Sequence, residues 1–382
     1  MSAGASPAGH LVHGMGKELE KPVWPAITRD EAEAVLALFA QAGDLQALCW
    51  HSPRPFSAAV LVETERGRFF LKRHHARLRS PVSLAQEHGF MRHLRAQGIP
   101  VPEVMVAHGG QTAVAQGDWT YELHRMGQGQ DLYREAPSWT GFQHIAHASA
   151  AGNALGRLHR AAQSYHAAAR GPDPLIASCT ILPADDPMGA AKAYVAARPA
   201  LAGFLSKRPW QAELARVLAN APADLAARLA AQPRLWTHND WHPSNLLWSP
   251  EGEVACVFDF GLATRTFALH DLATAIERCA IPWLDWQEGT AIKGDARAAL
   301  ALIEGYRQEC ALSADDLATM LDLLPLVHVE FALSEVDYFA GLVGDAAQAQ
   351  QAWQAYLIDH ADWFASPSGE DFLGHMREGL GL

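Results

Sequence analysis

Two short runs of mainly apolar residues near the start of the chain are separated by a polar turn. Residues 58–64 and 68–72 form the runs, and residues 65–67, Glu-Arg-Gly, lie between them. Two apolar runs around a short turn that contains glycine are typical of a β-hairpin. The pattern therefore predicts a hairpin with Lys72 near the end of its second strand.

A helical pattern follows this hairpin. Pro81 suits a helix start, residues 83–86, Ser-Leu-Ala-Gln, match a capping box, and Gly98 suits a helix end. Steps of three and four predict one buried stripe, which comprises Leu84, Glu87, Met91 and Leu94. A buried carboxylate needs a cation, and Lys72 is the candidate partner of Glu87.

Helical patterns dominate the rest of the chain. An amphipathic helix capped by Thr28 is expected first, and the texture becomes alanine-rich and helical from about residue 125. A last long helical segment begins at a cap on Ser313 and is expected to bend at Pro325. Helices are expected at residues 28–42, 189–206 and 209–231, and again from residue 269 to the end of the chain. This last stretch includes the segment 313–345.

This change of texture predicts two lobes in an α+β protein. Residues 1–22, rich in Gly, Ala and Ser, are expected to form a flexible tail. Residues 23–124 are expected to form an N-terminal lobe built on a sheet. Residues 125–382 are expected to form a larger, mainly helical lobe. With 49% hydrophobic residues, the 382-residue chain can fill such a core.

Composition excludes several classes of partner. A net charge of −12 argues against nucleic acid, because phosphate backbones demand clustered Lys and Arg. No apolar run approaches the roughly 20 residues of a membrane helix, so membrane insertion is not expected. Five widely spaced cysteines, an odd number, fit a reduced cytoplasmic protein. The oligomeric state cannot be inferred from the sequence.

Two acids and one amide recur at spacings that suit phosphoryl transfer. They lie in residues 238–245, His-Asn-Asp-Trp-His-Pro-Ser-Asn, and in residues 259–261, Asp-Phe-Gly. The reaction needs one carboxylate to orient the attacking hydroxyl, and a second carboxylate and an amide to hold magnesium. Asp240, Asp259 and Asn245 supply these groups. A strand, turn and strand between them would return Asp259 to Asn245.

The five-residue step from Asp240 to Asn245 matches the catalytic loop of kinases. The nineteen histidines are scattered, and none is paired with cysteine at zinc spacing. His238 is therefore expected to brace the loop backbone, and His242 to shape it. Together with Lys72, which would anchor the nucleotide phosphates, these residues predict a kinase that uses ATP and Mg²⁺.

These motifs, with His-Asp-Leu-Ala at 270–273, resemble those of the aminoglycoside phosphotransferase and choline kinase-like family. The resemblance covers roughly residues 30–340. It implies a bilobal protein-kinase-like fold, with one key helix beside a small N-terminal antiparallel sheet, and phosphorylation of small molecules. It further implies roles for single residues: Asp240 as the base, Asn245 and Asp259 as magnesium ligands, Lys72 with Glu87 as the phosphate anchor, and Asp271 as a structural brace of the loop.

The same resemblance suggests an adenine-binding hinge. Residues 121–124, Tyr-Glu-Leu-His, look like this hinge, where backbone groups near Glu122 and Leu123 would bind the base. His159, on a segment similar to the family's helix beneath the site, is interpreted as a core residue.

The phosphate-covering loop departs from the family pattern. Residues 51–57 contain no glycine, although glycine lets backbone N–H groups approach phosphate closely. Ser57 or Arg54 would have to contact the phosphates instead. The missing glycines leave open a nucleotide-binding regulator without turnover. A protein kinase is less favoured, because residues 262–270 leave no room for an activation segment.

The acceptor is expected to be a small hydroxyl compound: an amino alcohol, an aminoglycoside-like antibiotic or a homoserine-type amino acid. Glu330 and Asp337 share a helical stripe with apolar residues and could bind an ammonium group. The favoured alternative is that they bond to arginines or helix ends of the same lobe. A second candidate wall comprises Glu277, Arg278, Trp283 and Trp286, whose tryptophans would suit a cation or simply fill a core.

Overall fold

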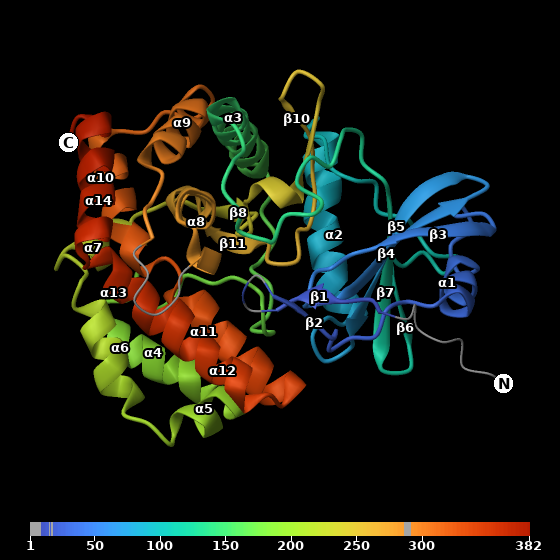
Figure 1. Cartoon of the computed structure of the whole chain (residues 1–382), viewed down its shortest axis with the longest axis horizontal. Helices are drawn as coiled ribbons and strands as arrows, with labels where there is room; N and C mark the ends of the chain where they lie inside the picture. Colours follow the sequence, from blue (N-terminus) through green and yellow to red (C-terminus); the bar gives the residue numbers. More distant parts are fainter. Residues whose placement is uncertain (1–8, 15, 17, 286–291) are drawn as a thin grey trace. The chain divides into compact units, whose positions relative to one another are not determined.

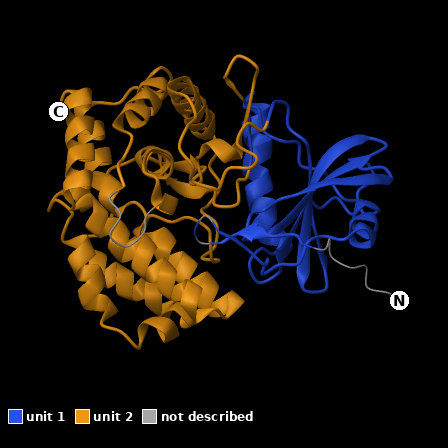
Figure 2. Cartoon of the chain, viewed as in Figure 1, with its two compact units in different colours: residues 1–130, 255–258 blue, residues 131–254, 259–382 orange. Residues whose placement is uncertain are grey.

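The computed structural model describes residues 9–14, 16, 18–285 and 292–382, which form two compact units (Figure 2). Unit 1 comprises residues 1–130 and 255–258, and unit 2 comprises residues 131–254 and 259–382. The first boundary thus falls after Gln130 and not after residue 124. Met126 N–H donates to the Arg68 carbonyl at 3.0 Å, which ties the chain beyond residue 124 to unit 1.

Unit 1 is built on a five-stranded antiparallel sheet (Figure 1). The predicted hairpin is confirmed and turns at Gly67, whose φ of +117° suits glycine. In spatial order the strands are β3 (Leu45–His51), β4 (Ala58–Thr64), β5 (Gly67–His75), β7 (Trp119–Arg125) and β6 (Ala113–Gln116). A separate pair contains β1 (Val12–His13) and β2 (Leu19–Glu20).

The first helix, α1 (Arg29–Leu36), begins at the predicted cap. The Thr28 side chain accepts from Glu31 N–H, and the Glu31 side chain accepts from Thr28 N–H. The helix ends at Leu36 and not at residue 42, because tighter turns follow: Phe39 N–H bonds to the Leu36 carbonyl. Its buried side chains join those of β4, β5 and β7 in the core of the unit.

The second helix of unit 1, α2 (Pro81–Ala96), begins three residues earlier than the predicted capping box. Ser80 is the cap and accepts from Ser83 N–H at 3.1 Å, so Ser83 is not the cap. Pro81, which has no N–H to satisfy, occupies the first turn as predicted. The predicted stripe is confirmed, and Glu87 lies within it with only 1% of its surface exposed.

Unit 2 is mainly helical. Two of its helices approach closely at glycines: a Cβ on Gly152 would lie 1.9 Å from the Leu302 carbonyl oxygen, and one on Gly305 would lie 1.9 Å from that of Ser149. The helices are α3 (Ile145–Ala162), α4 (Pro187–Ala196), α5 (Pro199–Leu205), α6 (Trp210–Leu218), α7 (Leu225–Ala230), α8 (Ala268–Ala280), α9 (Ala296–Arg307), α10 (Ala314–Leu323), α11 (Val329–Asp337), α12 (Ala346–Trp353), α13 (His360–Phe364) and α14 (Pro367–Leu380).

Four short strands surround the 238–245 loop in the sequence. β8 (Arg234–Thr237) precedes it and pairs with β11 (Thr264–Phe267). β9 (Leu246–Trp248) follows it and leads through a turn into β10 (Val254–Val257), as predicted. Ser249 closes that turn by donating its N–H to the Glu253 carbonyl at 2.8 Å.

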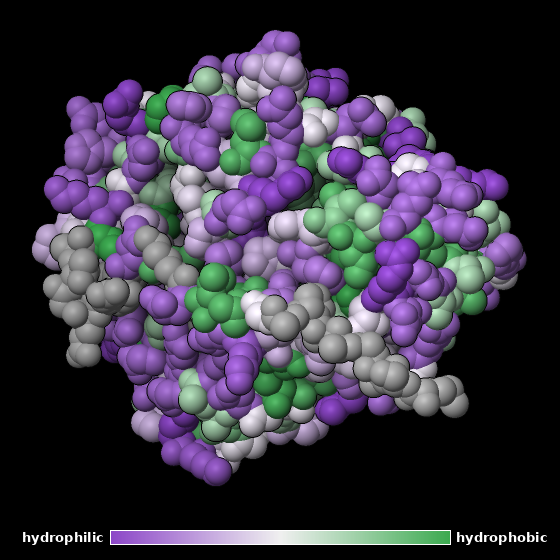
Figure 3. Space-filling view, turned by 45° about the vertical axis from the view of Figure 1, so that its right-hand side comes forward, coloured by the Kyte–Doolittle hydropathy of each residue, from purple (hydrophilic) through white to green (hydrophobic). Residues whose placement is uncertain are grey.

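The last long helical segment also follows its prediction. Ser313 forms a capping box with Asp316, and a 3₁₀ turn at Leu324–Leu326, which contains Pro325, separates α10 from α11. By length and hydropathy the stretch Ala314–Val343 could cross a membrane, although no apolar run of this length was expected from the sequence. However, 78% of its most apolar window is buried, as in a core helix. On the face in Figure 3, hydrophobic residues form small groups among hydrophilic ones.

Candidate active site

The 238–245 loop is held by one buried carboxylate. Asp271, in the first turn of α8, accepts the backbone N–H groups of His238 at 2.8 Å and Asn239 at 2.7 Å. Its Oδ2 also lies 3.0 Å from His159 Nε2, and the other nitrogen of His159 lies 2.8 Å from the Tyr306 hydroxyl. Asp271 is therefore placed as the resemblance implied, and His159 is a core residue that positions it.

Asn239, to which the sequence analysis gave no role, shapes the start of the loop. Its φ is +61°, in the left-handed region that asparagine tolerates better than most residues. Its buried Oδ1 accepts from the hydroxyls of Thr237 and Thr266 at 3.0 and 3.1 Å and lies 3.2 Å from His270 Nδ1. These contacts fix the loop to both strands of the β8–β11 pair.

Asp240 is the partly exposed carboxylate of this loop, with 16% of its side chain accessible. It accepts from Asn245 Nδ2 at 3.1 Å and forms an ion pair with the Arg278 guanidinium. Burial by itself would raise the pKa of Asp240, but Arg278 and His242 outweigh burial and hold that pKa below its ordinary value. Asp240 is therefore ionised at neutral pH.

Arg278 is the site residue whose role the sequence analysis missed. It is buried, and its guanidinium lies over the rings of Trp139 and Phe331, 5.1 and 4.8 Å from their centroids. The spacing in the sequence could have indicated this role. Arg278 follows Asp271 by two helical turns, so both side chains lie on one face of α8. The sequence placed it only in a possible substrate wall.

Asn245 ends the loop in a short 3₁₀ turn. Its amide nitrogen donates to the Asp240 backbone carbonyl at 2.9 Å and lies 3.1 Å from His242 Nε2. His242 is buried and its Nδ1 lies 3.0 Å from the Ser244 hydroxyl, so it shapes the loop as expected. These contacts use the amide nitrogen of Asn245, and its oxygen is the atom that suits a hard cation such as Mg²⁺.

Asp259 follows β10 in an unusual backbone conformation. Its φ is +59°, in the left-handed region that aspartate adopts more readily than most residues other than glycine. A Cβ on Gly261 would lie 3.4 Å from Asp259 Oδ1. An acidic oxygen and an amide oxygen form a donor set that fits Mg²⁺, but their sharing of one ion stays a prediction.

In unit 1, Lys72 on β5 lies opposite Glu122 on β7, and Nζ is 3.8 Å from Oε1. The pairing of Lys72 with Glu87 stays a prediction. The hinge interpretation of Glu122 and Leu123 is wrong, because both lie within β7, between β5 and β6. The Leu123 carbonyl accepts from Met105 N–H at 2.8 Å, so this backbone serves the sheet.

The glycine-free loop connects β3 to β4. Ser57 directly precedes β4, and Arg54 N–H donates to the Ser52 hydroxyl at 3.3 Å. Contacts of Ser57 or Arg54 with nucleotide phosphates stay a prediction.

Two acids proposed for the substrate hold the backbone of unit 2 instead. The Glu330 carboxylate accepts from two backbone N–H groups of the 178–181 segment at 2.5 and 2.6 Å, and from hydroxyls of the same segment. Asp337 accepts from Leu201 N–H, in the first turn of α5, at 3.1 Å. The alternative interpretation holds for Asp337, which bonds to a helix end. Glu330 also bonds within its own lobe, but to a segment that is not helical.

Glu277 and Trp283 belong to a buried aromatic cluster. Glu277 Oε1 lies 3.1 Å from His360 Nε2 and 3.6 Å from His328 Nδ1. Burial would raise the pKa of Glu277, but the two histidines outweigh burial and lower it. Trp283 donates to the Glu277 carbonyl at 3.0 Å and stacks on His360, so it fills the core. Trp286 lies outside the described residues.

A small pocket in unit 2 lies beside the catalytic loop. It is lined by Ser178, Asn239, Glu277, Arg278, His328 and Phe331, among others. Its wall carries a carboxylate and a guanidinium together, so it offers partners of both signs to a polar ligand.

Glu335 on α11 carries a prediction about pH. Burial raises the pKa of Glu335 to about 8, so the folded protein keeps its carboxyl protonated at neutral pH. In the unfolded chain this carboxyl releases its proton at about pH 4.3. The contribution of Glu335 to the free energy of unfolding therefore falls as pH rises from about 4.3 to about 8. Glu335→Gln keeps the neutral form. We expect its stability advantage over wild type to widen by about 4 kcal/mol between pH 5 and 9.

Urea unfolding at several pH values measures this advantage. Glu378→Gln, which changes an exposed carboxyl on α14, is the control. A constant difference between Glu335→Gln and wild type across this pH range would contradict the prediction.

The loop, its brace and the ionised Asp240 have the arrangement that the sequence predicted for phosphoryl transfer. A model of the phosphotransferase enzyme family matches residues 53–312, which is more than half of the chain. The chain belongs to this family. Comparison with curated protein sequences finds no match.

Solved structures show the same fold. An amicoumacin kinase is 17% identical, with 87% of this chain and 93% of that chain covered, at a TM-score of 0.57. A microcompartment-associated aminopropanol kinase is 17% identical, with 90% and 99% covered, at 0.56. An aminoglycoside phosphotransferase from Alicyclobacillus acidocaldarius is 19% identical, with 91% and 96% covered, at 0.52. The predicted protein-kinase-like fold class is thereby confirmed.

Proposed function

We propose that this phosphotransferase moves the γ-phosphoryl group of ATP to a hydroxyl of a small molecule in the cytoplasm. The observation that carries the proposal is the ionised Asp240 on a loop whose backbone is fixed by Asp271. Such a loop holds a carboxylate in place before the acceptor arrives, and positioning is the main contribution of a kinase to catalysis.

The residues then divide the work. Asp240 accepts a hydrogen bond from the acceptor hydroxyl. This bond orients the hydroxyl oxygen toward the γ-phosphorus of ATP. Asn245 and Asp259 would hold Mg²⁺, which supplies neutralisation of charge on the phosphates. Lys72, with Glu87, would anchor those phosphates. Structures with this fold contain AMP-PNP and Ca²⁺ in the amicoumacin kinase and ADP in a spectinomycin phosphotransferase, which supports use of a nucleotide and a divalent ion.

Because Asp240 is paired with Arg278, its role is to orient the acceptor hydroxyl rather than to remove the hydroxyl proton early. The guanidinium keeps the pKa of Asp240 low, so the carboxylate is a weak base. In a loose transition state the acceptor oxygen keeps its proton until late, and a weak base is then sufficient.

The acceptor classes are amino alcohols, aminoglycoside-like antibiotics and homoserine-type amino acids. Relatives in fold are named for aminopropanol, amicoumacin and spectinomycin, which supports a hydroxylated amine. The pocket beside Arg278 reaches Asn239 of the catalytic loop, but it has room for about one water molecule and is too small to hold these acceptors.

A direct test is ADP release that depends on Mg²⁺ and ATP, measured with homoserine, choline, ethanolamine, aminopropanol, amino sugars and aminoglycosides. Release stimulated by one class of acceptor would support the proposal and name that class. The glycine-free 51–57 loop favours one alternative, a regulator that binds nucleotide without turnover. Nucleotide binding without release for any acceptor would favour that regulator.

A further inference from the structure

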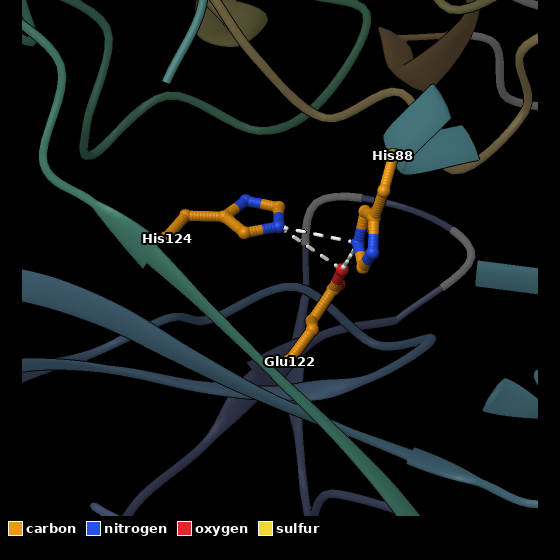
Figure 4. A group of neighbouring side chains, drawn as sticks. All are labelled: His88, Glu122 and His124. Carbon is orange, nitrogen blue, oxygen red and sulfur yellow. Dashed lines mark hydrogen bonds and ion pairs between the residues drawn. The ribbon is translucent and has the colours of Figure 1, made fainter. Parts of the chain in front are cut away.

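Three side chains of unit 1 converge on one point in its interior (Figure 4). His88 Nε2 lies 2.6 Å and His124 Nε2 lies 3.1 Å from the same oxygen, Glu122 Oε2. The two imidazole nitrogens lie 3.4 Å from each other. Three metal-ligating atoms from two secondary-structure elements thus surround a common centre.

The fold builds this group from residues that the sequence separates. Glu122 and His124 are two positions apart on β7, so both side chains point to one face of the sheet. His88 reaches the same face from α2. His88 and Glu122 are fully buried, and His124 keeps 11% of its side chain exposed. Cysteine-based spacing in the sequence could not reveal such a group.

We propose that His88, Glu122 and His124 bind a divalent transition metal ion, with zinc as the first candidate. Two imidazoles and one carboxylate form a donor set that zinc uses with a fourth position left for water or another ligand. Ligands about 2.0–2.1 Å from a tetrahedral ion lie about 3.4 Å from each other. The nitrogen–nitrogen distance of 3.4 Å meets this requirement, and the carboxylate oxygen moves outward slightly on binding.

The second oxygen of Glu122 is oriented by other groups. His74 Nε2 lies 2.9 Å from Oε1, and Lys72 Nζ lies 3.8 Å from it. These contacts hold the carboxylate so that Oε2 faces the two imidazoles. Such outer contacts are typical around metal ligands.

A metal ion here ties α2 to β7. His88 is adjacent to Glu87, so the ion would also fix the helical turn that carries Glu87. The ion would stabilise unit 1 by tying these two elements together, with a water molecule in its fourth position.

A second group of possible ligands, in unit 2, is less suitable. Glu277 lies 3.6 Å from His328 and 3.1 Å from His360, whose rings stack at an angle of 25°. Stacked rings direct their in-plane lone pairs in nearly parallel directions, so these two imidazoles do not converge on one ion, whereas the rings of His88 and His124 lie at 76° to each other. The proposal is therefore restricted to unit 1.

The test uses the full-length protein without a histidine tag. Metal content is measured by mass spectrometry after purification. The protein is then stripped with a chelator and titrated with Co²⁺, whose visible absorption reports tetrahedral coordination, and with Zn²⁺ in competition. We expect one ion per chain, a metal-dependent rise in the midpoint of thermal unfolding, and at least about a hundredfold weaker binding in His88→Gln and in His124→Gln.

His108→Gln, which changes an exposed histidine of unit 1, is the matched control and should bind as wild type does. Circular dichroism checks that each variant is folded. If a variant does not fold, X-ray absorption of the wild-type zinc complex must show two imidazoles and a carboxylate. The proposal would be overturned if wild type held no stoichiometric metal, or if both folded variants bound metal as tightly as wild type does. Either result would leave a hydrogen-bonded cluster only.

Discussion

Asp240→Asn is expected to reduce kcat by at least about a hundredfold and to leave ATP affinity close to that of wild type. The amide has no negative charge to orient the acceptor hydroxyl. It also removes the nearer of the two carboxylates that contact the buried Arg278. ATP binding would change little, because the proposed magnesium and phosphate contacts belong to other residues. Acceptor-stimulated ADP release and calorimetric titration of nucleotide measure the two effects.

Asp371→Asn, an exposed substitution on α14, controls for the change of charge. Turnover near that of wild type in Asp240→Asn would remove Asp240 from the proposed role. Loss of nucleotide affinity together with turnover would instead indicate that the loop itself had been displaced, and thermal unfolding of the variant would separate these outcomes.

The features that the sequence predicted well depend on neighbouring residues. The caps predicted at Thr28 and Ser313 depend only on residues within one helical turn, and both are present, whereas the capping box predicted at Ser83 lies three residues beyond the true cap, Ser80. The hairpin that carries Lys72 also follows from a local alternation of apolar and polar positions. Such patterns act through the first turn of a helix or one pair of strands, so they survive in almost any tertiary context.

The partners of Glu330 and Asp337 could not be predicted, because a helical stripe shows which side chains point inward but not what they meet. Glu330 meets backbone donors of the 178–181 segment, about 150 positions earlier in the chain. No local pattern specifies that contact. The prediction of a hinge at Glu122 and Leu123 was wrong for a related reason. β7 continues to Arg125, and the ends of strands are poorly marked in sequence.

The site in unit 2 combines both kinds of information. The spacing from Asp240 to Asn245 is local, and it predicted a loop that the structure contains. The contacts of Asp240 with Arg278 and of Asn239 with the β8–β11 pair are long-range, and they appear only in the structure. The motif thus identifies the chemistry, whereas the long-range contacts set its charge and geometry.

Asp271→Asn tests the most connected of these long-range contacts. The carboxylate accepts two backbone N–H groups of the loop through its two oxygens. An amide keeps one oxygen and turns an N–H₂ group toward the other donor, which leaves a buried N–H unpaired. We expect the free energy of unfolding to fall by about 2–4 kcal/mol and kcat to fall at least about tenfold. Urea unfolding and ADP release measure these effects.

His159→Gln is the matched comparison, because it changes the third partner of the same carboxylate and leaves both backbone contacts in place. It should therefore cost less stability and less turnover than Asp271→Asn. Equal losses in the two variants would mean that packing around Asp271, and not its hold on the loop backbone, accounts for the effect. Full activity of Asp271→Asn would show that the catalytic loop keeps its shape without this brace.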